Sequence, residues 1–316
     1  MSPSKLKQYP NTQIMTYSPE NIPLVSIVVY VYNSEAFIIE TLESIKAQTY
    51  PKLELIITDD LSKDSTLELV EEWIDINKLR FERTQVVRAT HNTGIAGNNN
   101  RGLAATTGEW VKFVPGDDLL FPEAVSILVT QQQNPLTEFV YSNVILFRDH
   151  VDNVLKQKGA LVEAPLEANL VKENKILAMS TLIKRSRLVA LGGFDERYPM
   201  IDDWPLWLKM AENKVNFEYI DKTTAGYRKH NANVSKTGVS RLYLQSWVSF
   251  CKDQLIPKGW EYGFYEITYY RSIDKIVFNL QSNFKNAHII KAINTLHLLK
   301  PRFLQDYIKQ KKQNFA

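Results

Sequence analysis

Several absences in the sequence exclude whole classes of protein. A single cysteine, Cys251, leaves no partner for an internal disulfide and too few thiols for a cysteine-based metal site. The longest apolar run near the N-terminus, residues 24–32, is far shorter than the roughly 20 residues that a membrane-spanning helix needs. Residues 1–22 are polar and carry no apolar core of the kind found in signal peptides. We therefore expect a cytoplasmic protein in a reducing compartment.

Glycine-rich phosphate motifs and a strong excess of positive charge are also missing. No G-x-G-x-x-G follows the first apolar run and no G-x-x-x-x-G-K-[ST] occurs in the chain. Their absence weakens the case for a dinucleotide-binding oxidoreductase or a P-loop phosphotransferase. The 38 Lys and Arg against 35 Asp and Glu leave a net charge of +3, which argues against nucleic acid as the main partner.

One local excess of positive charge stands at the C-terminal end. From residue 285 onward a single acidic residue, Asp306, accompanies a series of basic ones: Lys285, Lys291, Lys300, Arg302, Lys309, Lys311 and Lys312. Two interpretations stay open for this basic tail. It is either the solvated end of a helix or a surface that contacts anionic lipid.

What the sequence does contain is the composition of a globular protein. Hydrophobic residues make up 44% and charged residues 23% of the 316 residues, close to the usual averages. The length indicates about two domains, or one α/β domain with an appendage. No internal repeat is visible, so a solenoid or a propeller is not expected.

Strand and helix patterns alternate through the first part of the chain. The predicted strands are residues 24–32, 53–58, 84–88 and 109–114. The predicted helices are residues 35–48 and 66–76, and a third that begins near Asn98. This alternation predicts an α/β fold with a doubly wound, mostly parallel, Rossmann-like sheet and helices on both faces.

The pattern is less regular in the second part. We expect helices at 122–132 and 203–211, and strands at 138–147 and 180–184. A turn at 192–195 follows a short helix. From Arg241 the pattern is helical, which predicts a helical C-terminal extension. The domain prediction is an N-terminal arm, residues 1–22, an α/β domain, residues 23–236, and the extension, residues 237–316.

Polar residues follow three of the predicted strands. Asn33 follows the first, Asp59 and Asp60 end the second, and Asp117 and Asp118 follow the strand at 109–114. Ligands of open parallel sheets bind at the carboxyl ends of the strands. Each group alone is a common turn composition, but three at one edge of a sheet predict a ligand site.

Two pairs of adjacent carboxylates are candidates for chemistry. Asp117 and Asp118 follow Gly116, and a divalent cation held by hard oxygen ligands would relieve the repulsion between them. The alternative is that Asp118 caps a helix. Asp202 and Asp203 precede a predicted helix, where they are either ordinary complements of the helix dipole or include a general base.

An ordered set of segments resembles family 2 glycosyltransferases with the GT-A fold. The resemblance runs from about residue 23 to residue 235 and leaves the rest of the C-terminal part outside. The segments that carry it are 25–33 with Glu35, 57–66, 92–94, 99–102, 108–118, 192–195, 202–207 and 227–235. Any one of these motifs is weak evidence, but their order and spacing together are specific.

The resemblance implies transfer of a sugar from a nucleotide-diphosphate donor to an acceptor hydroxyl, with inversion at the anomeric carbon. It makes Asp203 the catalytic base, and Asp117, Asp118 and His230 the side chains that bind Mn²⁺ or Mg²⁺. Asp202 and Trp204 would lie at the sugar or the acceptor. The implied nucleotide-binding residues are Tyr30, Tyr32, Asn33, Glu35, Asp60, Asn92, Asn99, Asn100 and Gly116.

Within this resemblance the α/β domain divides into a nucleotide-binding half, residues 23–118, and an acceptor half, residues 119–236. Tyr32 would lie against the base of the donor, and Asp60 would accept a hydrogen bond from a ring N–H. UDP is the expected nucleotide, and the expected acceptor is a glycan or a lipid-linked sugar of bacterial surface polysaccharide synthesis. The basic C-terminal helices would then touch the inner face of the membrane.

Three positions depart from the family pattern. Pro115 replaces the first carboxylate of the D-x-D motif, Tyr30 replaces a proline at the end of the first strand, and Asn99 replaces an arginine. Pro115 and Asn99 favour an alternative, a non-catalytic nucleotide-sugar-binding or scaffold protein on the same fold. Retention of Asp117 and Asp203 favours the enzyme, since a binding module needs no base. A nucleotidyltransferase would need a basic glycine-rich loop that the sequence lacks.

Overall fold

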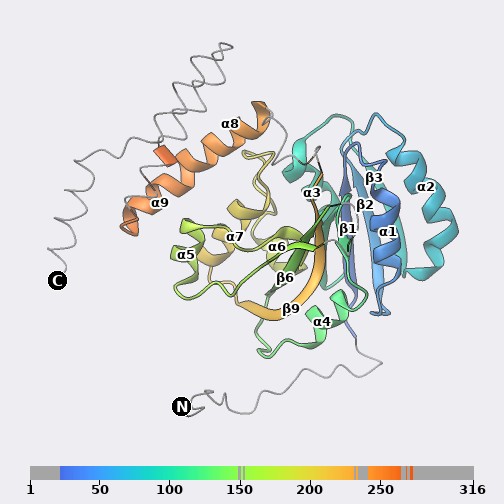
Figure 1. The fold of residues 1–316 in the computed structure, drawn as a ribbon, viewed down its shortest axis with the longest axis horizontal. Helices are drawn as coiled ribbons and strands as arrows, with labels where there is room; N and C mark the ends of the chain where they lie inside the picture. Colours follow the sequence, from blue (N-terminus) through green and yellow to red (C-terminus); the bar gives the residue numbers. More distant parts are fainter. Residues whose placement is uncertain are drawn as a thin grey trace.

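A computed structural model describes residues 22–148, 151, 154–230, 233, 241–264, 268 and 271–272 (Figure 1). The basic tail lies outside these described residues, as does the N-terminal arm except for Ile22. The first part of the chain alternates as predicted. Its elements are β1 (Val25–Val31), α1 (Ile38–Lys46), β2 (Leu53–Asp59), α2 (Thr66–Asn77), the 3₁₀ turn Lys78–Arg80, β3 (Arg83–Arg88), α3 (Gly94–Ala105) and β4 (Trp110–Pro115).

The second part contains elements that the sequence patterns did not predict, among them β7 (Val154–Lys158), α5 (Leu166–Lys172) and β9 (Phe217–Arg228). Its other elements are β5 (Leu119–Leu120), α4 (Ala124–Thr130), β6 (Phe139–Phe147), β8 (Thr181–Lys184), α6 (Arg185–Ala190) and α7 (Asp203–Glu212). Helices α8 (Arg241–Phe250) and α9 (Ile256–Glu261) follow, joined by the π-helical segment Cys251–Leu255. The exposed, polar character of β7 explains why no strand was expected there.

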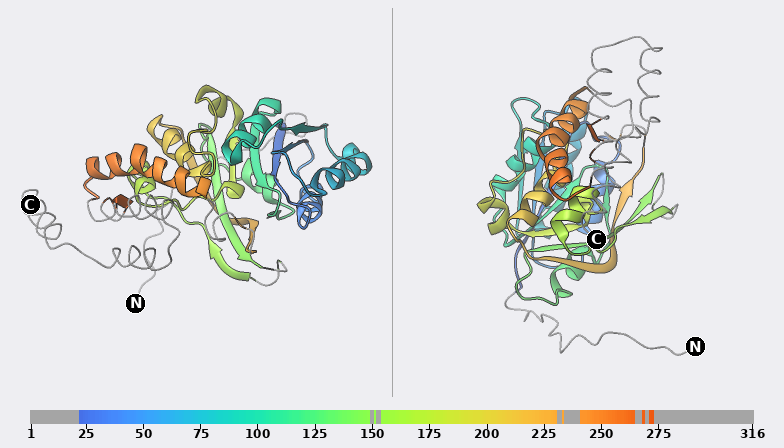
Figure 2. Two further views of the ribbon diagram at one scale, coloured as in Figure 1. Left: turned by 90° about the horizontal axis from the view of Figure 1, so that it is seen from above. Right: turned by 90° about the vertical axis from the view of Figure 1, so that its left-hand side faces the viewer.

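The strands form one mixed sheet in the order β3-β2-β1-β4-β8-β6-β9-β5, and β7 pairs with the part of β6 that lies beyond its pairing with β8. Strands β3, β2, β1 and β4 are parallel neighbours, and β6 and β9 are also parallel. Strands β5, β7 and β8 pair antiparallel to their neighbours. The prediction of a mostly parallel α/β sheet is therefore confirmed, with antiparallel strands added after β4. The β6–β7 hairpin extends away from the helices (Figure 2).

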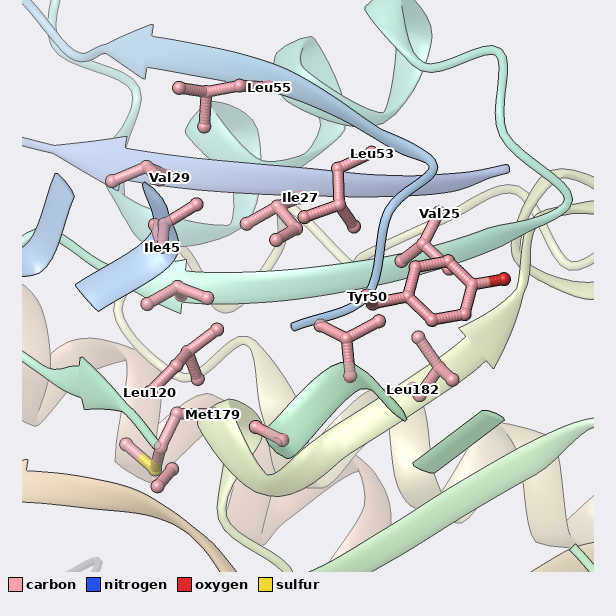
Figure 3. Packing of buried hydrophobic residues seen from close by; sticks show 14 of the residues in the cluster. Val25, Ile27, Val29, Ile45, Tyr50, Leu53, Leu55, Leu120, Met179 and Leu182 are labelled. Carbon is pink, nitrogen blue, oxygen red and sulfur yellow. The ribbon is translucent and has the colours of Figure 1, made fainter. Parts of the chain in front are cut away.

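Helices cover both faces of the sheet, which makes three layers. Apolar residues of α1, α2 and α4 pack with alternate residues of β1 and β2 on one face, where Ile27, Leu55 and Ile45 are fully buried (Figure 3). Helices α3, α5, α6 and α7 cover the other face, together with residues of α8 and the segment after it. Trp110 and Trp207 are each 1% exposed, so both belong to the core.

Two helices begin at other residues than the patterns predicted. Helix α1 begins at Ile38 and not at Glu35, because the Ser34 carbonyl accepts the N–H groups of Phe37 and Ile38 in a turn that comes first. Helix α3 begins at Gly94, four residues before Asn98. Gly94 has a φ of +80° and a Cβ there would lie 2.7 Å from the Pro199 carbonyl oxygen, so only glycine fits. Within the described ranges no helix is long and apolar enough to cross a membrane.

Candidate active site

The carboxyl ends of β1, β2 and β4 meet at one edge of the sheet, as the polar strand ends predicted. Tyr30 of β1 lies in register between Thr58 of β2 and Pro115 of β4. Beyond β4, the Gly116 N–H donates to the Tyr30 carbonyl at 3.0 Å. A Cβ on Gly116 would come within 2.7 Å of the Val31 side chain, so glycine lets the chain turn tightly here.

The loop after β1 is tied to the loop after β2. The Asn33 backbone N–H donates to the Ser62 hydroxyl at 2.9 Å, and its side-chain oxygen accepts the Lys63 N–H at 2.8 Å. The Glu35 carboxylate accepts the Ser65 N–H at 3.0 Å. Tyr32 lies in the same loop with 46% of its surface exposed. Asn33 and Glu35 therefore shape a surface beside which Tyr32 presents an open aromatic ring.

Asp60 lies at the start of α3. Its carboxylate accepts the backbone N–H groups of Thr93, at 2.9 Å, and Gly94, at 2.8 Å, and also the Thr93 hydroxyl. It is only 2% exposed, and negative charge at this end of a helix complements the helix dipole. Asn92 donates to the Asp60 carbonyl at 3.1 Å. The structure thus gives Asp60 a capping role at the start of α3, which no local sequence pattern predicts.

Asp117 and His230 come together from β4 and from the end of β9. His230 Nε2 lies 2.9 Å from Asp117 Oδ2, and the two side chains are 17% and 25% exposed respectively. A carboxylate oxygen and an imidazole nitrogen are both ligands that Mn²⁺ accepts. The two residues are separated by 113 positions in the chain, and only the pairing of β9 with β5 and β6 brings them together.

Asp118, predicted as a further metal ligand, is directed into the protein. Its side chain is fully buried, and Oδ1 accepts the Arg228 backbone N–H at 2.8 Å. Burial and the neighbouring charge of Asp117 raise its pKa well above the usual value of an aspartate. In this conformation Asp118 supports the turn after β4 and does not share an open site with Asp117.

Asp202 and Asp203 lie at the N-terminus of α7 and form the second acidic pair. Burial, and after it the charge of Asp203, raises the pKa of Asp202 to about 7. Burial raises the pKa of Asp203 to about 6. Asp203 Oδ1 accepts the Trp204 N–H at 2.6 Å and Oδ2 accepts the Asn174 amide at 3.0 Å, so its carboxylate is held in one orientation.

The Tyr30 side chain interacts electrostatically with the carboxylates of both acidic pairs. Burial, followed by the charges of Asp202, Asp118, Asp117 and Asp203 in that order, raises its pKa well above 10. The phenol therefore stays protonated. No hydrogen bond to its hydroxyl forms within the described part of the chain, which leaves this donor free for a ligand.

Two of the predicted nucleotide-binding residues bond to other parts of the chain. Asn99 is fully buried and donates its amide to Asp202 Oδ2 at 2.8 Å. Asn100 bonds the backbone of Phe194 through its amide and its carbonyl oxygen, which fastens the 192–195 turn to α3. Asn99 and Asn100 therefore stabilise the acidic pair and the neighbouring turn, where a nucleotide contact was expected.

Trp204, expected at the sugar or the acceptor, packs among the helices. Its indole N–H donates to the Leu170 carbonyl of α5 at 2.7 Å. Its ring lies 5.8 Å from that of Trp247 and 5.6 Å from that of Phe250, and the Arg271 guanidinium lies 5.5 Å from its centroid. These contacts make it an anchor between α7, α5 and α8.

Comparison with known proteins identifies the family of this chain. The family model described as glycosyl transferase family 2 matches residues 26–182. These residues contain β1, the loops after β1 and β2, and the turn after β4 that carries Asp117 and Asp118, called the acidic turn below. The chain belongs to this family. It is thus an enzyme that transfers sugar from nucleotide-sugar donors, and the resemblance seen in the sequence is confirmed.

Two relatives of this glycosyltransferase illustrate the match. A protein of Escherichia coli, UDP-Glc:alpha-D-GlcNAc-diphosphoundecaprenol beta-1,3-glucosyltransferase WfaP, is 28% identical over 71% of this chain and 84% of its own length. An uncharacterized glycosyltransferase of Haemophilus influenzae is 26% identical over 68% of each chain.

Solved structures confirm the GT-A fold. TarS of S. aureus, residues 1–349 with UDP-GlcNAc, superposes with a TM-score of 0.56 and 21% identity over 72% of this chain and 66% of that one. The mannosyltransferase PcManGT of Pyrobaculum calidifontis, with GDP-Man and Mn²⁺, has a TM-score of 0.59 and 19% identity over 96% and 87%. At such identities the likeness shows the fold alone.

Two residues of the glycosyltransferase site were not singled out from its sequence. Asn174 precedes α7 by many residues in a stretch without a motif, so nothing in the sequence pointed to its contact with Asp203. Arg228 stands in the segment 227–235 that contributed to the resemblance, two residues before His230. An arginine so close to a candidate metal ligand is the signal that could have found it.

Proposed function

We propose that this chain is an inverting, metal-dependent glycosyltransferase that takes a UDP-sugar and glycosylates a hydroxyl of a glycan or lipid-linked acceptor. The observation that carries the proposal is the pair of acidic centres at one edge of the sheet. Asp117 with His230 forms the first, and Asp202 with Asp203 forms the second. Tyr30 interacts with the carboxylates of both centres.

Asp203 has the properties of a general base. A pKa of about 6 leaves its carboxylate ionised at neutral pH while giving it more affinity for a proton than an exposed aspartate has. Its hydrogen bonds to Asn174 and to the Trp204 N–H hold the carboxylate in place. An acceptor hydroxyl that gives its proton to Asp203 attacks the anomeric carbon from the face opposite the leaving diphosphate, and the configuration inverts.

Asp202 keeps the charge of the base pair low. Two adjacent carboxylates resist double ionisation, and a pKa of about 7 means that Asp202 retains its proton over part of the neutral range. Asn99 donates to its Oδ2 and fixes its position. The pair therefore offers one strong proton acceptor, Asp203, beside a carboxyl group that can remain neutral.

Asp117 and His230 fit a divalent cation, since they place an oxygen and a nitrogen ligand 2.9 Å apart. Within the described residues no group of three or more His, Cys, Asp or Glu side chains could hold a metal by itself. Mn²⁺ and Mg²⁺ commonly complete their coordination with substrate phosphates and water. When bound, the cation would neutralise charge that develops on the leaving diphosphate.

The nucleotide would lie over the loops after β1 and β2. Tyr32 offers an exposed ring for stacking against the base, and Asn33 and Glu35 hold the loop beside it. WfaP is named for a UDP-Glc donor and a diphospholipid-linked acceptor, and TarS binds UDP-GlcNAc. These names support a UDP-sugar and a lipid-linked acceptor here, used in the cytoplasm or at the inner face of the membrane.

The division into a nucleotide-binding half, residues 23–118, and an acceptor half, residues 119–236, is part of this proposal. The first ends at the acidic turn, and the second carries α7 with its base and β9 with His230. The extension from residue 237 includes α8, which packs on Trp204 through Trp247 and Phe250. The extension is thus joined to the helix that bears the base.

A thermal-shift panel tests the donor and the metal together. UDP, GDP, dTDP and CDP are each added with and without Mn²⁺ to the wild type and to Asp117→Ala. A ligand at a hundredfold excess over its Kd stabilises the native state by about 2.7 kcal/mol. We expect a Mn²⁺-dependent shift with UDP that Asp117→Ala loses. No shift with any nucleotide would contradict the proposal.

A measurement of turnover distinguishes the enzyme from the alternative, a non-catalytic binding protein. Pro115 occupies the end of β4 where the family has a carboxylate, and this favours weaker cation binding. Release of UDP from UDP-sugar is measured with the wild type and with Asp203→Asn. If the wild type binds UDP but releases no more UDP from UDP-sugar than Asp203→Asn does, the chain is a binding protein. If the wild type releases UDP and Asp203→Asn does not, the chain is an enzyme.

A further inference from the structure

Arg228, the last residue of β9, is buried beside the acidic turn although it is charged. The residue is 3% exposed, and its guanidinium carbon lies 5.1 Å from the ring centroid of Phe37 and 4.7 Å from that of Phe147. Rings at these distances stabilise a guanidinium that has lost its water. The guanidinium is therefore held firmly, between a residue next to α1 and a residue of β6.

The polar groups of Arg228 bind the acidic turn at two points. Its backbone N–H donates to Asp118 Oδ1 at 2.8 Å, and its Nε donates to the Asp117 carbonyl at 3.0 Å. Its Nη2 donates to Glu40 Oε2 at 2.6 Å, across to α1. One side chain thus joins the turn after β4 to β9 and to α1. The planar fork of arginine makes the Nε and Nη2 bonds at once, which a lysine ammonium cannot do.

The same network reaches His230. The His230 backbone N–H donates to Asn233 Oδ1 at 2.7 Å, and the Asn233 amide donates to the Arg228 carbonyl at 3.1 Å. The Phe37 ring that packs on Arg228 also lies 4.5 Å from the His230 ring. Both members of the Asp117–His230 pair are consequently connected to Arg228. Asp117 is connected through its backbone carbonyl, and His230 through Asn233 and the Phe37 ring.

We propose that Arg228 is a positioning residue that sets the separation of Asp117 and His230 for a divalent cation. The inference rests on the proposed function, since it takes this pair as the cation site. Arg228 carries a positive charge, and its Nε bonds the backbone carbonyl of Asp117, so it acts by holding the turn in place and not as a ligand. Partners of this kind around a metal site commonly change metal affinity by 10- to 100-fold when they are altered.

The test measures Mn²⁺ affinity directly. Free Mn²⁺ is followed by electron paramagnetic resonance in the presence of UDP, for the wild type, Arg228→Lys and Glu40→Gln. We expect Arg228→Lys to lower Mn²⁺ affinity by about tenfold or more. Glu40→Gln weakens one anchor of the guanidinium and should lower Mn²⁺ affinity less. The affinity for UDP without metal should stay the same in both, which general damage to the fold would not allow.

Two further variants make the result decisive. Arg197→Lys is the matched control, because Arg197 is an exposed arginine paired with Asp195 away from the turn. If Asp117→Asn binds Mn²⁺ as the wild type does, the proposed metal site itself is wrong. If Asp117→Asn loses Mn²⁺ while Arg228→Lys and Glu40→Gln keep the wild-type affinity, the inference on Arg228 is overturned and the metal site stands. If Arg228→Lys fails to fold, Glu40→Gln alone decides.

Discussion

Asn174 Nδ2 donates to Asp203 Oδ2 at 3.0 Å, so a residue from the segment between α5 and β8 orients the carboxylate at the start of α7. The bond favours the ionised carboxylate and lowers the pKa of Asp203 against the larger effect of burial, which raises it. The pKa of Asp203, the base of the proposed reaction, is therefore set by two opposing influences, burial and the hydrogen bond from Asn174. A substitution of Asn174 alters the second without the first.

The first prediction concerns the pH dependence of the wild type. Since the pKa of Asp203 is raised to about 6 and a base must be ionised, transfer should increase as pH rises through about 6. Asp202, at about 7, is coupled to it and broadens the transition. The measurement is kcat/KM between pH 5 and pH 8. A rate that stays flat down to pH 5 would exclude Asp203 as the base.

Removal of the base is the second prediction. Asp203→Asn should lower kcat by about 10²- to 10⁴-fold, the usual contribution of a positioned general base. The variant should still bind UDP, because the nucleotide loops lie on other elements. Asp75→Asn is a suitable control, since the Asp75 side chain is 79% exposed on α2. Equal loss of UDP binding and of rate would indicate misfolding in place of lost catalysis.

Asn174→Ala should move the acid limb of the pH profile. Loss of the amide donor removes an influence that lowers the pKa of Asp203, so the pKa rises and the limb shifts to higher pH. At high pH the rate should approach that of the wild type. A profile of kcat/KM against pH measures the position of the limb and the rate at high pH. A uniform fall in rate with an unmoved limb would show that Asn174 does not act through Asp203.

Tyr30→Phe tests the hydroxyl between the acidic centres. Because this hydroxyl bonds no described residue, its removal should leave the melting temperature unchanged. If it donates to the bound donor, the KM for UDP-sugar should increase by about two- to tenfold, the worth of one neutral hydrogen bond. Isothermal titration with UDP and with UDP-sugar shows which part of the donor it contacts. An unchanged KM would remove Tyr30 from the binding site.

Glu54 should contribute to stability in a pH-dependent way. Burial raises its pKa, but hydrogen bonds from Ser26, Thr107 and Gly108 outweigh this and leave the pKa below the usual value. A lowered folded-state pKa means that the stabilisation is present above the unfolded-state pKa and is lost as pH falls through the folded-state value.

The corresponding variant is Glu54→Gln, which keeps the shape but loses the charge that accepts these bonds. It should lower the free energy of unfolding at pH 7 by about 1.5–3 kcal/mol, and the difference should shrink toward pH 3. Urea denaturation at both pH values measures this. Glu71→Gln, at an exposed position on α2, should show neither effect. A constant difference across pH would contradict the linkage.

Much of the fold could be predicted because its signals are local. Apolar runs in β1 and β2 indicate strands buried on both faces, and the helical spacing of Ile38, Leu42 and Ile45 indicates α1. The strand β9 was missed because its exposed half is polar and its pairing partners β5 and β6 lie far away in the chain. Such non-local pairing leaves no periodic pattern to detect.

The sequence by itself determined the alternation of strands and helices, the polar strand ends and the family, since each depends on residue types at short spacing. Only the tertiary structure decided which carboxylates face the site. Adjacent residues at a turn point in different directions, so Asp117 meets His230 while Asp118 is buried against Arg228. Tertiary packing likewise gave Asn100 and Trp204 partners on distant elements, since their amide and indole groups donate to the carbonyls of Phe194 and Leu170.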